Sequence, residues 1–221
     1  MSIILSASTN PPKTEEEMYS YIAKLDKSEV DFIHCDVMDG KFVENKTYNH
    51  KDVKIINTIT NKKLDVHLMV KNPTFKIPKY IHAGADVLTI HFESYKNKKK
   101  LIKDLQKIRR LGAFAGLSFN PDTQVVEILP FVSYCDMLLV MSVVPGKSGQ
   151  KFMEETYARL CTINSYLASE GLEVAIEVDG GVNLQNLPKL IECSVTSVVM
   201  GNYLYTTKDL NKTIKQIKAV K

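Results

Sequence analysis

Short apolar runs alternate along the whole chain with longer stretches in which apolar and charged residues mix. Runs of strand length, rich in Val, Ile and Leu, span 2–7, 31–36, 64–69, 87–91, 113–118, 137–142, 173–178 and 195–200. Apolar residues recur at the three- and four-residue spacing of amphipathic helices within 13–25, 51–59, 74–83, 97–111, 123–129, 152–170, 184–193 and 208–220. The pattern predicts eight strands, each followed by a helix.

This strict alternation favours a parallel sheet, because each strand returns to its neighbour through a crossover helix. Eight units in 221 residues give about 28 residues per unit, which is the size of one βα unit. We therefore predict an α/β fold, a (β/α)8 TIM barrel that forms a single domain over 1–221. A doubly wound open sheet is the alternative. The barrel is favoured because chemically functional residues follow strands throughout the chain, where barrels build their active sites.

Two histidines and two aspartates fall at the ends of predicted strands. In a strand, residues two apart share a face, so His34 and Asp36 point the same way. His67 ends another strand and Asp179 follows a third. Buried carboxylates are costly unless they are paired or bind a metal. If these strands end side by side, the four groups predict a divalent metal site that can also move protons.

His91 also ends a strand. The sequence is equally compatible with a position in the pocket and with a packed position in the core. His50 and His82 lie in loop or helix context and are expected at the surface.

Glycines follow the last three strands, where a TIM barrel commonly binds phosphate. Glycine lets backbone N–H groups approach an anion closely. The candidate phosphate-binding residues are Gly146, Gly149, Gly180, Gly181, Gly201 and Asn202. Met38, Met69 and Met141 stand at strand ends beside the polar cluster, where thioethers could keep the reacting centre dry or simply fill the core.

Composition and charge narrow the class of protein. The chain is 44% hydrophobic and 24% charged with a net charge of +4, which is ordinary for a globular protein. This charge gives no reason to expect a nucleic-acid or membrane partner, and it suits an anionic metabolite. The four cysteines form no Cys-x-x-Cys pair, and neither a leader pattern nor a membrane-spanning run is present. We expect a cytoplasmic, reducing location.

In the order and spacing of its motifs, the chain resembles the ribulose-phosphate 3-epimerase family from residue 3 to about 205. The matching segments are 34–43, 65–70, 84–86, 141–143, 145–146, 149–152 and 177–182. The resemblance implies that His34, Asp36, His67 and Asp179 are metal ligands. It also implies that Asp36 and Asp179 are the catalytic acid–base pair of a carbohydrate isomerase, and Ser6 is the best candidate for a substrate-contacting serine.

The reaction implied is the epimerisation of D-ribulose 5-phosphate to D-xylulose 5-phosphate at C3, a step of the pentose phosphate pathway. With that substrate we expect Asp36 to act as the base and Asp179 as the acid. One divalent ion per subunit is expected, with Zn²⁺ as the first choice for this donor set and Fe²⁺, Mn²⁺ or Co²⁺ as alternatives. A homo-oligomer, either a dimer or a hexamer, is also expected.

Departures from the family pattern lie in the loops that would hold the sugar and the phosphate. Lys147 and Ser148 stand in a loop that usually carries an aromatic residue, and Asn202 follows Gly201 where a serine is usual. These changes leave the same chemistry on D-allulose 6-phosphate as an alternative. Related decarboxylases carry Asp-x-Lys where this chain has Asp65-Val66-His67, which argues against them. A non-catalytic phosphate- or metal-binding barrel is the third hypothesis, which the aspartate pair opposes.

Overall fold

Eight parallel strands pair in sequence order and close into a barrel, because β8 also pairs with β1. A computed structural model of the protein describes residues 2–220. The strands are β1 (Ile4–Ser8), β2 (Phe32–Met38), β3 (Lys63–Met69), β4 (Ala85–His91), β5 (Phe114–Phe119), β6 (Met137–Met141), β7 (Ala175–Asp179) and β8 (Ser197–Met200). The predicted TIM barrel is confirmed.

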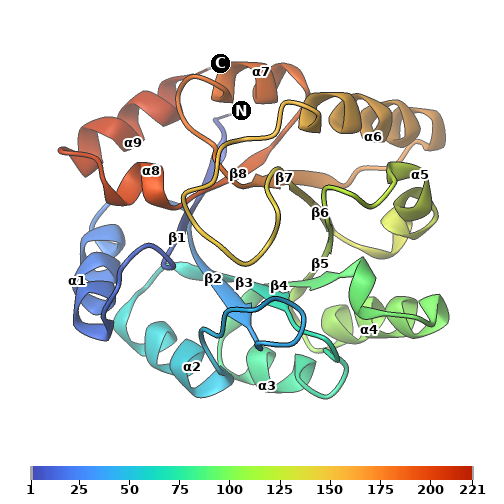
Figure 1. Cartoon of the computed structure of the whole chain (residues 1–221), viewed down its shortest axis with the longest axis horizontal. Coiled ribbons are helices and arrows are strands. Elements are labelled where there is room, and N and C mark those ends of the chain that lie inside the picture. The colour runs from blue at the N-terminus through green and yellow to red at the C-terminus, as the bar shows by residue number, and fades with distance from the viewer. Residues whose placement is uncertain (1, 221) are drawn as a thin grey trace.

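Helices surround the barrel as an outer ring (Figure 1). They are α1 (Glu15–Asp26), α2 (His50–Ile59), α3 (Ile77–His82), α4 (Lys98–Arg110), α5 (Val125–Ile128), α6 (Thr156–Glu170), α7 (Leu187–Glu192), α8 (Asn202–Tyr205) and α9 (Leu210–Ala219), with short 3-10 turns η1 (Phe92–Ser94) and η2 (Leu129–Tyr134). Among the described residues 2–220, no helix has the length and apolarity that a membrane crossing requires.

The helix boundaries differ from the sequence prediction mainly near the barrel rim. Helix α6 begins at Thr156, four residues later than predicted, because the segment before it runs across the rim, where Met153 N donates to Ser142 O at 2.9 Å. Helix α8 was not predicted; it follows Gly201 directly. At the start of α1 and of α2, Thr14 and Asn49 cap the helix with their side chains.

Each strand places one set of side chains against the helices and the alternate set inside the barrel. In β2, Ile33, Cys35 and Val37 belong to the main apolar core, whereas His34 and Asp36 point inward and are buried. Because the outward set packs the helix layer, a shift of register by one residue would turn it into the barrel interior and bring the polar set against the helices. The apolar layer therefore fixes which polar side chains face the interior.

Strand register then brings the polar residues to one level of the barrel. Asp36 is paired with His67 across β2 and β3, and Met141 is paired with Asp179 across β6 and β7. On the other side of β2, Ser8 is paired with His34. All of these positions lie at or near the C-terminal ends of their strands, which is the face on which TIM barrels carry their active sites.

Candidate active site

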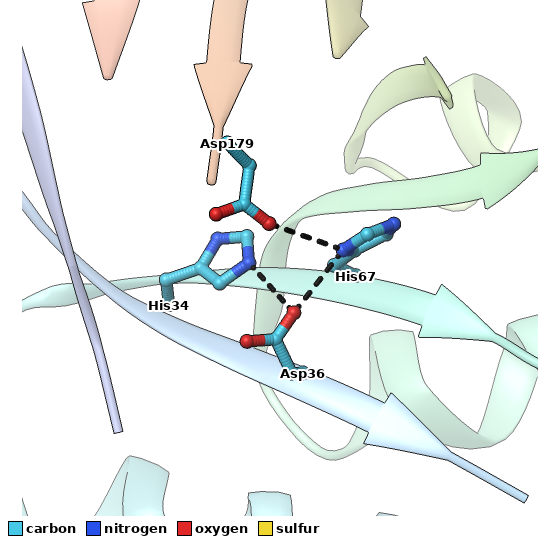
Figure 2. Close-up of side chains that lie close together, drawn as sticks. All are labelled: His34, Asp36, His67 and Asp179. Atoms are coloured by element: carbon cyan, nitrogen blue, oxygen red, sulfur yellow. Dashed lines mark hydrogen bonds and ion pairs between the residues drawn. The ribbon is translucent and has the colours of Figure 1, made fainter. Parts of the chain in front are cut away.

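Two histidines and two aspartates from β2, β3 and β7 converge at the C-terminal end of the barrel (Figure 2). Asp36 Oδ1 lies 3.2 Å from both His34 Nε2 and His67 Nδ1. Asp179 Oδ2 lies 3.9 Å from His67 Nδ1. One nitrogen or oxygen from each of the four side chains falls within 4.8 Å of all the others. The predicted cluster therefore forms in the folded protein.

The two carboxyl groups of this cluster have opposite tendencies to ionise. Burial works against ionisation of Asp36, but His34 and His67 outweigh it and lower the pKa of Asp36 below its usual range. Burial, and then the negative charge of Asp36, raise the pKa of Asp179 to about 6. Asp36 is thus the group that is ionised first, whereas Asp179 holds a proton to a higher pH.

The two imidazoles also differ. Burial disfavours the charged form of His34, but the carboxylates of Asp65 and Asp36 raise the pKa of its imidazole well above the usual range. Burial lowers the pKa of His67. Both rings are completely buried, so their ring nitrogens must be satisfied by the protein or by a ligand in the site.

The donor set fits a divalent cation. Two imidazole nitrogens and two carboxylate oxygens are a common ligand combination for zinc and for other first-row metals. Without a positive charge between them, the buried carboxylates of Asp36 and Asp179 repel each other, and burial together with this repulsion raises the pKa of Asp179. A 2+ ion would relieve the repulsion directly.

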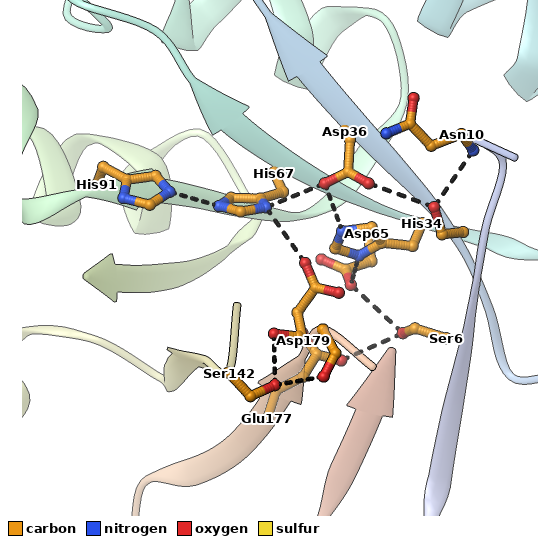
Figure 3. Close-up of polar contacts among 12 residues, drawn as sticks. Ser6, Asn10, His34, Asp36, Asp65, His67, His91, Ser142, Glu177 and Asp179 are labelled. Carbon is orange, nitrogen blue, oxygen red and sulfur yellow. Dashed lines mark hydrogen bonds and ion pairs between the residues drawn. The ribbon is translucent and has the colours of Figure 1, made fainter. Parts of the chain in front are cut away.

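A second set of polar residues, deeper in the barrel, supports His34 (Figure 3). Asp65 Oδ2 lies 2.6 Å from His34 Nδ1, which leaves Nε2 of that ring directed at the cluster. Ser6 Oγ lies 3.3 Å from Asp65 Oδ2 and 3.2 Å from Glu177 Oε1. Sequence reasoning missed these roles of Asp65 and Glu177, although each stands two residues before His67 or Asp179 and so shares its inward face.

Ser6 itself does not reach the cavity, because it is fully buried among these deeper carboxyl groups. Ser8, two residues further along β1, does line the cavity. Its hydroxyl donates to Asp36 Oδ2 at 3.3 Å and accepts from Asn10 N at 3.2 Å. Ser6, predicted as a substrate contact, therefore lies one inward position deeper than the cavity wall, where Ser8 stands.

A cavity of about 250 Å³ lies above the cluster. Asp36 and Asp179 form part of its wall, and the three predicted methionines, Met38, Met69 and Met141, line it and are almost completely buried. The predicted glycine-loop residues also line it: Gly146, Gly149, Gly180, Gly181, Gly201 and Asn202. The cavity therefore combines an apolar, acidic floor with a glycine-rich rim.

The rim loops are tightly packed where their glycines lie. A side chain at Gly181, where φ is +63°, would meet Phe152 N at 2.5 Å, so only glycine fits there. Asn45 Nδ2 donates to Gly146 O at 2.7 Å and ties the loop after β2 to the loop after β6. Loop–loop contacts therefore hold the rim in shape.

The other three histidines lie outside the cluster and differ in exposure. His82 is exposed and His50 is half-buried. His91 is completely buried, with Nε2 lying 2.8 Å from His67 Nε2. It therefore contacts the site from behind His67 and does not line the cavity.

The fold and this site together define a class: a TIM-barrel protein with two carboxyl groups, two imidazoles and a glycine-rich rim at the C-terminal face of the barrel. Residues 4–205 match the model of the "Ribulose-phosphate 3 epimerase family". The chain belongs to this family.

Curated relatives agree with the family assignment. The chain is 39% identical to "Ribulose-5-phosphate-3-epimerase, chloroplastic" of Arabidopsis thaliana over 86% of this chain and 68% of that protein. It is 36% identical to "Ribulose-phosphate 3-epimerase" of Bacillus subtilis (strain 168) over 90% of this chain and 91% of that protein. These relatives are isomerases. A solved structure of KGPDC from Streptococcus mutans superimposes with a TM-score of 0.72 at 12% identity, covering 100% of this chain and 99% of that one, which shows a common fold.

Proposed function

We propose that the protein is a metal-dependent epimerase that interconverts D-ribulose 5-phosphate and D-xylulose 5-phosphate at C3. One observation carries this proposal: Asp36 and Asp179 meet at the floor of one cavity with opposite shifts in pKa. Epimerisation requires a base on one face of the reacting carbon and an acid on the other. Membership of the family supports the same chemistry.

In the direction from ribulose 5-phosphate, the ionised Asp36 removes the C3 proton, which is acidic because C3 lies next to the C2 carbonyl. The protonated Asp179 delivers a proton to the opposite face of C3. In the reverse direction the two residues exchange roles. Between the steps, negative charge lies on the C2 and C3 oxygens as an enediolate. Ser8 supports Asp36 by donating to its second oxygen, and Met38, Met69 and Met141 exclude water from the floor.

His34, Asp36, His67 and Asp179 would hold the metal ion. When bound, a divalent ion supplies Lewis-acid stabilisation of the enediolate oxygens, a contribution of several kcal/mol in such reactions. Zn²⁺ is our first choice for two imidazoles with two carboxylates, and Fe²⁺, Mn²⁺ and Co²⁺ fit the same donors. The raised pKa of His34 means that its imidazole gives up a proton when the ion binds.

The glycine rim would bind the phosphate of the substrate. Gly146, Gly181, Gly201 and Asn202 line the cavity, and their backbone N–H groups are candidate donors to phosphate oxygens. Lys147 is exposed on the rim, so its ammonium group would remain largely in solvent. This arrangement binds the phosphate group through main chain and leaves side-chain identity at the rim free to vary.

That freedom leaves D-allulose 6-phosphate as the competing substrate, because Ser148 and Asn202 line the same cavity and differ from the usual family residues. We expect faster turnover of ribulose 5-phosphate. The test measures kcat/KM for both sugars with the protein loaded with Zn²⁺, together with metal content and exchange of the C3 proton with solvent. A higher kcat/KM for allulose 6-phosphate would contradict the pentose assignment, and metal binding without C3 exchange would indicate a non-catalytic barrel.

Assembly as a homo-oligomer (a dimer or a hexamer) and a cytoplasmic location both stay predictions from the sequence. The Arabidopsis relative is named as a chloroplast protein, so location varies among relatives.

A further inference from the structure

Behind the proposed metal site, a row of hydrogen-bonding groups leads from β4 and η1 to His67. Figure 3 shows its last link, between His91 and His67. His67 directs Nδ1 to Asp36 and Asp179 and Nε2 to His91, whose own Nε2 lies 2.8 Å away. The two ring centroids are 4.9 Å apart with an interplanar angle of 20°, so the rings meet edge to edge and nearly coplanar. This is hydrogen-bond geometry, in which one nitrogen donates and the other accepts.

The far end of the row is a carboxylate. His91 Nδ1 lies 3.1 Å from Glu93 Oε2. The other oxygen, Oε1, accepts from Asn120 N at 2.8 Å and from Thr123 Oγ at 2.5 Å. Burial alone would raise the pKa of Glu93, but these hydrogen bonds lower it to about 2. Glu93 is therefore an anion that can only accept hydrogen bonds.

A pure acceptor at one end sets the direction of every hydrogen bond in the row. His91 must carry a proton on Nδ1 in order to donate to Glu93. In neutral His91, Nε2 is then an acceptor, and its partner, His67, must carry its proton on Nε2. The lone pair of His67 Nδ1 is consequently directed at Asp36 and Asp179. This is the form of the ring that can bind a cation between the two carboxylates.

We propose that Glu93 and His91 are positioning residues that fix the tautomer of His67 and thereby make its Nδ1 a metal ligand. The two histidines of the site thus have different supports. His34 is supported by the direct carboxylate contact of Asp65, whereas His67 reaches its carboxylate through a second imidazole. The inference rests on the proposed function only in taking a divalent metal as the ligand of the cluster.

The substitution Glu93→Gln tests this assignment because it changes one oxygen into an N–H₂ group at almost unchanged volume. Two donors, Asn120 N and Thr123 Oγ, face the Oε1 position, so the amide oxygen belongs there and the amide N–H₂ faces His91. In the metal-free variant the row can reverse: the amide donates to His91 Nδ1, His91 Nε2 donates to His67, and His67 Nδ1 donates to Asp36. All groups are then satisfied, and the proton occupies the position of the metal.

In the metal-bound variant no direction satisfies the row. Metal on His67 Nδ1 requires the proton on Nε2, which forces a proton onto His91 Nδ1 opposite the amide N–H₂. We therefore expect Glu93→Gln to weaken Zn²⁺ binding about 10- to 100-fold, the usual effect of removing a partner of a metal-bound histidine. The melting temperature of the metal-free protein should stay close to that of the native chain.

The experiment measures the dissociation constant for Zn²⁺ by competition with a chromophoric chelator, and Tm in the absence of metal. Glu127→Gln is the matched control, since Glu127 is exposed on α5 and its substitution makes the same change of charge outside the row. His91→Phe is a second variant that keeps a ring beside Phe42, whose centroid lies 4.7 Å from that of His91. It removes the acceptor and should weaken Zn²⁺ binding as well.

Nitrogen-15 NMR of the Zn²⁺-loaded protein reads the tautomers directly. We expect protons on Nδ1 of His91 and on Nε2 of His67. A proton on Nε2 of His91, or Zn²⁺ affinity in Glu93→Gln equal to that in Glu127→Gln, would overturn the assignment. A low Tm of metal-free Glu93→Gln with unchanged Zn²⁺ affinity would show that the residue is merely structural. Weak Zn²⁺ binding in Glu93→Gln together with native C3 exchange in the Zn²⁺-saturated variant would support the assignment. Loss of C3 exchange in the native protein would instead count against the proposed function alone.

Discussion

The floor and the rim of the active site are built in different ways. The floor consists of side chains on β2, β3 and β7, and the register of those strands fixes their positions. The rim consists of glycine-rich loops, held by contacts such as that of Asn45 with Gly146. The floor therefore depends on the identity of each side chain, whereas the rim depends on backbone shape. The chain departs from the usual family residues at the rim and keeps them at the floor.

The largest effect should come from changing the two carboxyl groups of the floor. We expect Asp36→Asn and Asp179→Asn each to lower kcat by at least about 100-fold, because each removes one of the two proton carriers. Steady-state kinetics on ribulose 5-phosphate check this, with metal content measured in parallel because both residues belong to the proposed metal site. Near-native kcat in a fully metal-loaded Asp179→Asn protein would contradict its role as a proton carrier.

The chemistry of the floor was predictable because strand periodicity alone places His34 beside Asp36, and the repeated strand–helix pattern predicts that the strands end on one face. The same periodicity predicts inward positions for Asp65 and Glu177, but not which inward residues reach the cavity. That depends on depth along the barrel: Ser6 is buried below the cavity, whereas Ser8 lines it. The contact of His67 with His91 depends on ring orientation in three dimensions, and no local pattern encodes it.

Metal binding at the floor should depend on pH. The pKa of His34 is raised well above its usual range, so its imidazole holds a proton that a metal must displace. Affinity for Zn²⁺ should therefore increase as pH rises, by at least about tenfold between about pH 5.5 and 7.5. Calorimetry in buffers of different ionisation enthalpy should show net release of protons on binding. Affinity independent of pH would contradict the raised pKa of His34.

The rim should respond to backbone changes more strongly than to side-chain changes. A Cβ at Gly201 would lie 3.3 Å from Ser8 Cβ and 3.4 Å from Pro11 Cγ. Gly201→Val therefore crowds the loop, and we expect KM to rise at least about tenfold, which corresponds to an overpacking cost within about 1–3 kcal/mol. Asn202→Ala keeps the backbone N–H and serves as the control, with a much smaller rise. Equal KM values for the two variants would refute a phosphate grip made by main chain.

The smallest effect should come from Lys147, which lines the cavity from the rim loop after β6. It is exposed, and an exposed ion pair with phosphate contributes about 0–1 kcal/mol. Lys147→Ala should therefore raise KM less than about fivefold, and the difference should shrink as salt is added because exposed charges are screened. Lys151→Ala is the matched control, since Lys151 is exposed nearby and does not line the cavity. A rise in KM well above fivefold, insensitive to salt, would mean that Lys147 folds over the phosphate, and the rim would then depend on a side chain as the floor does.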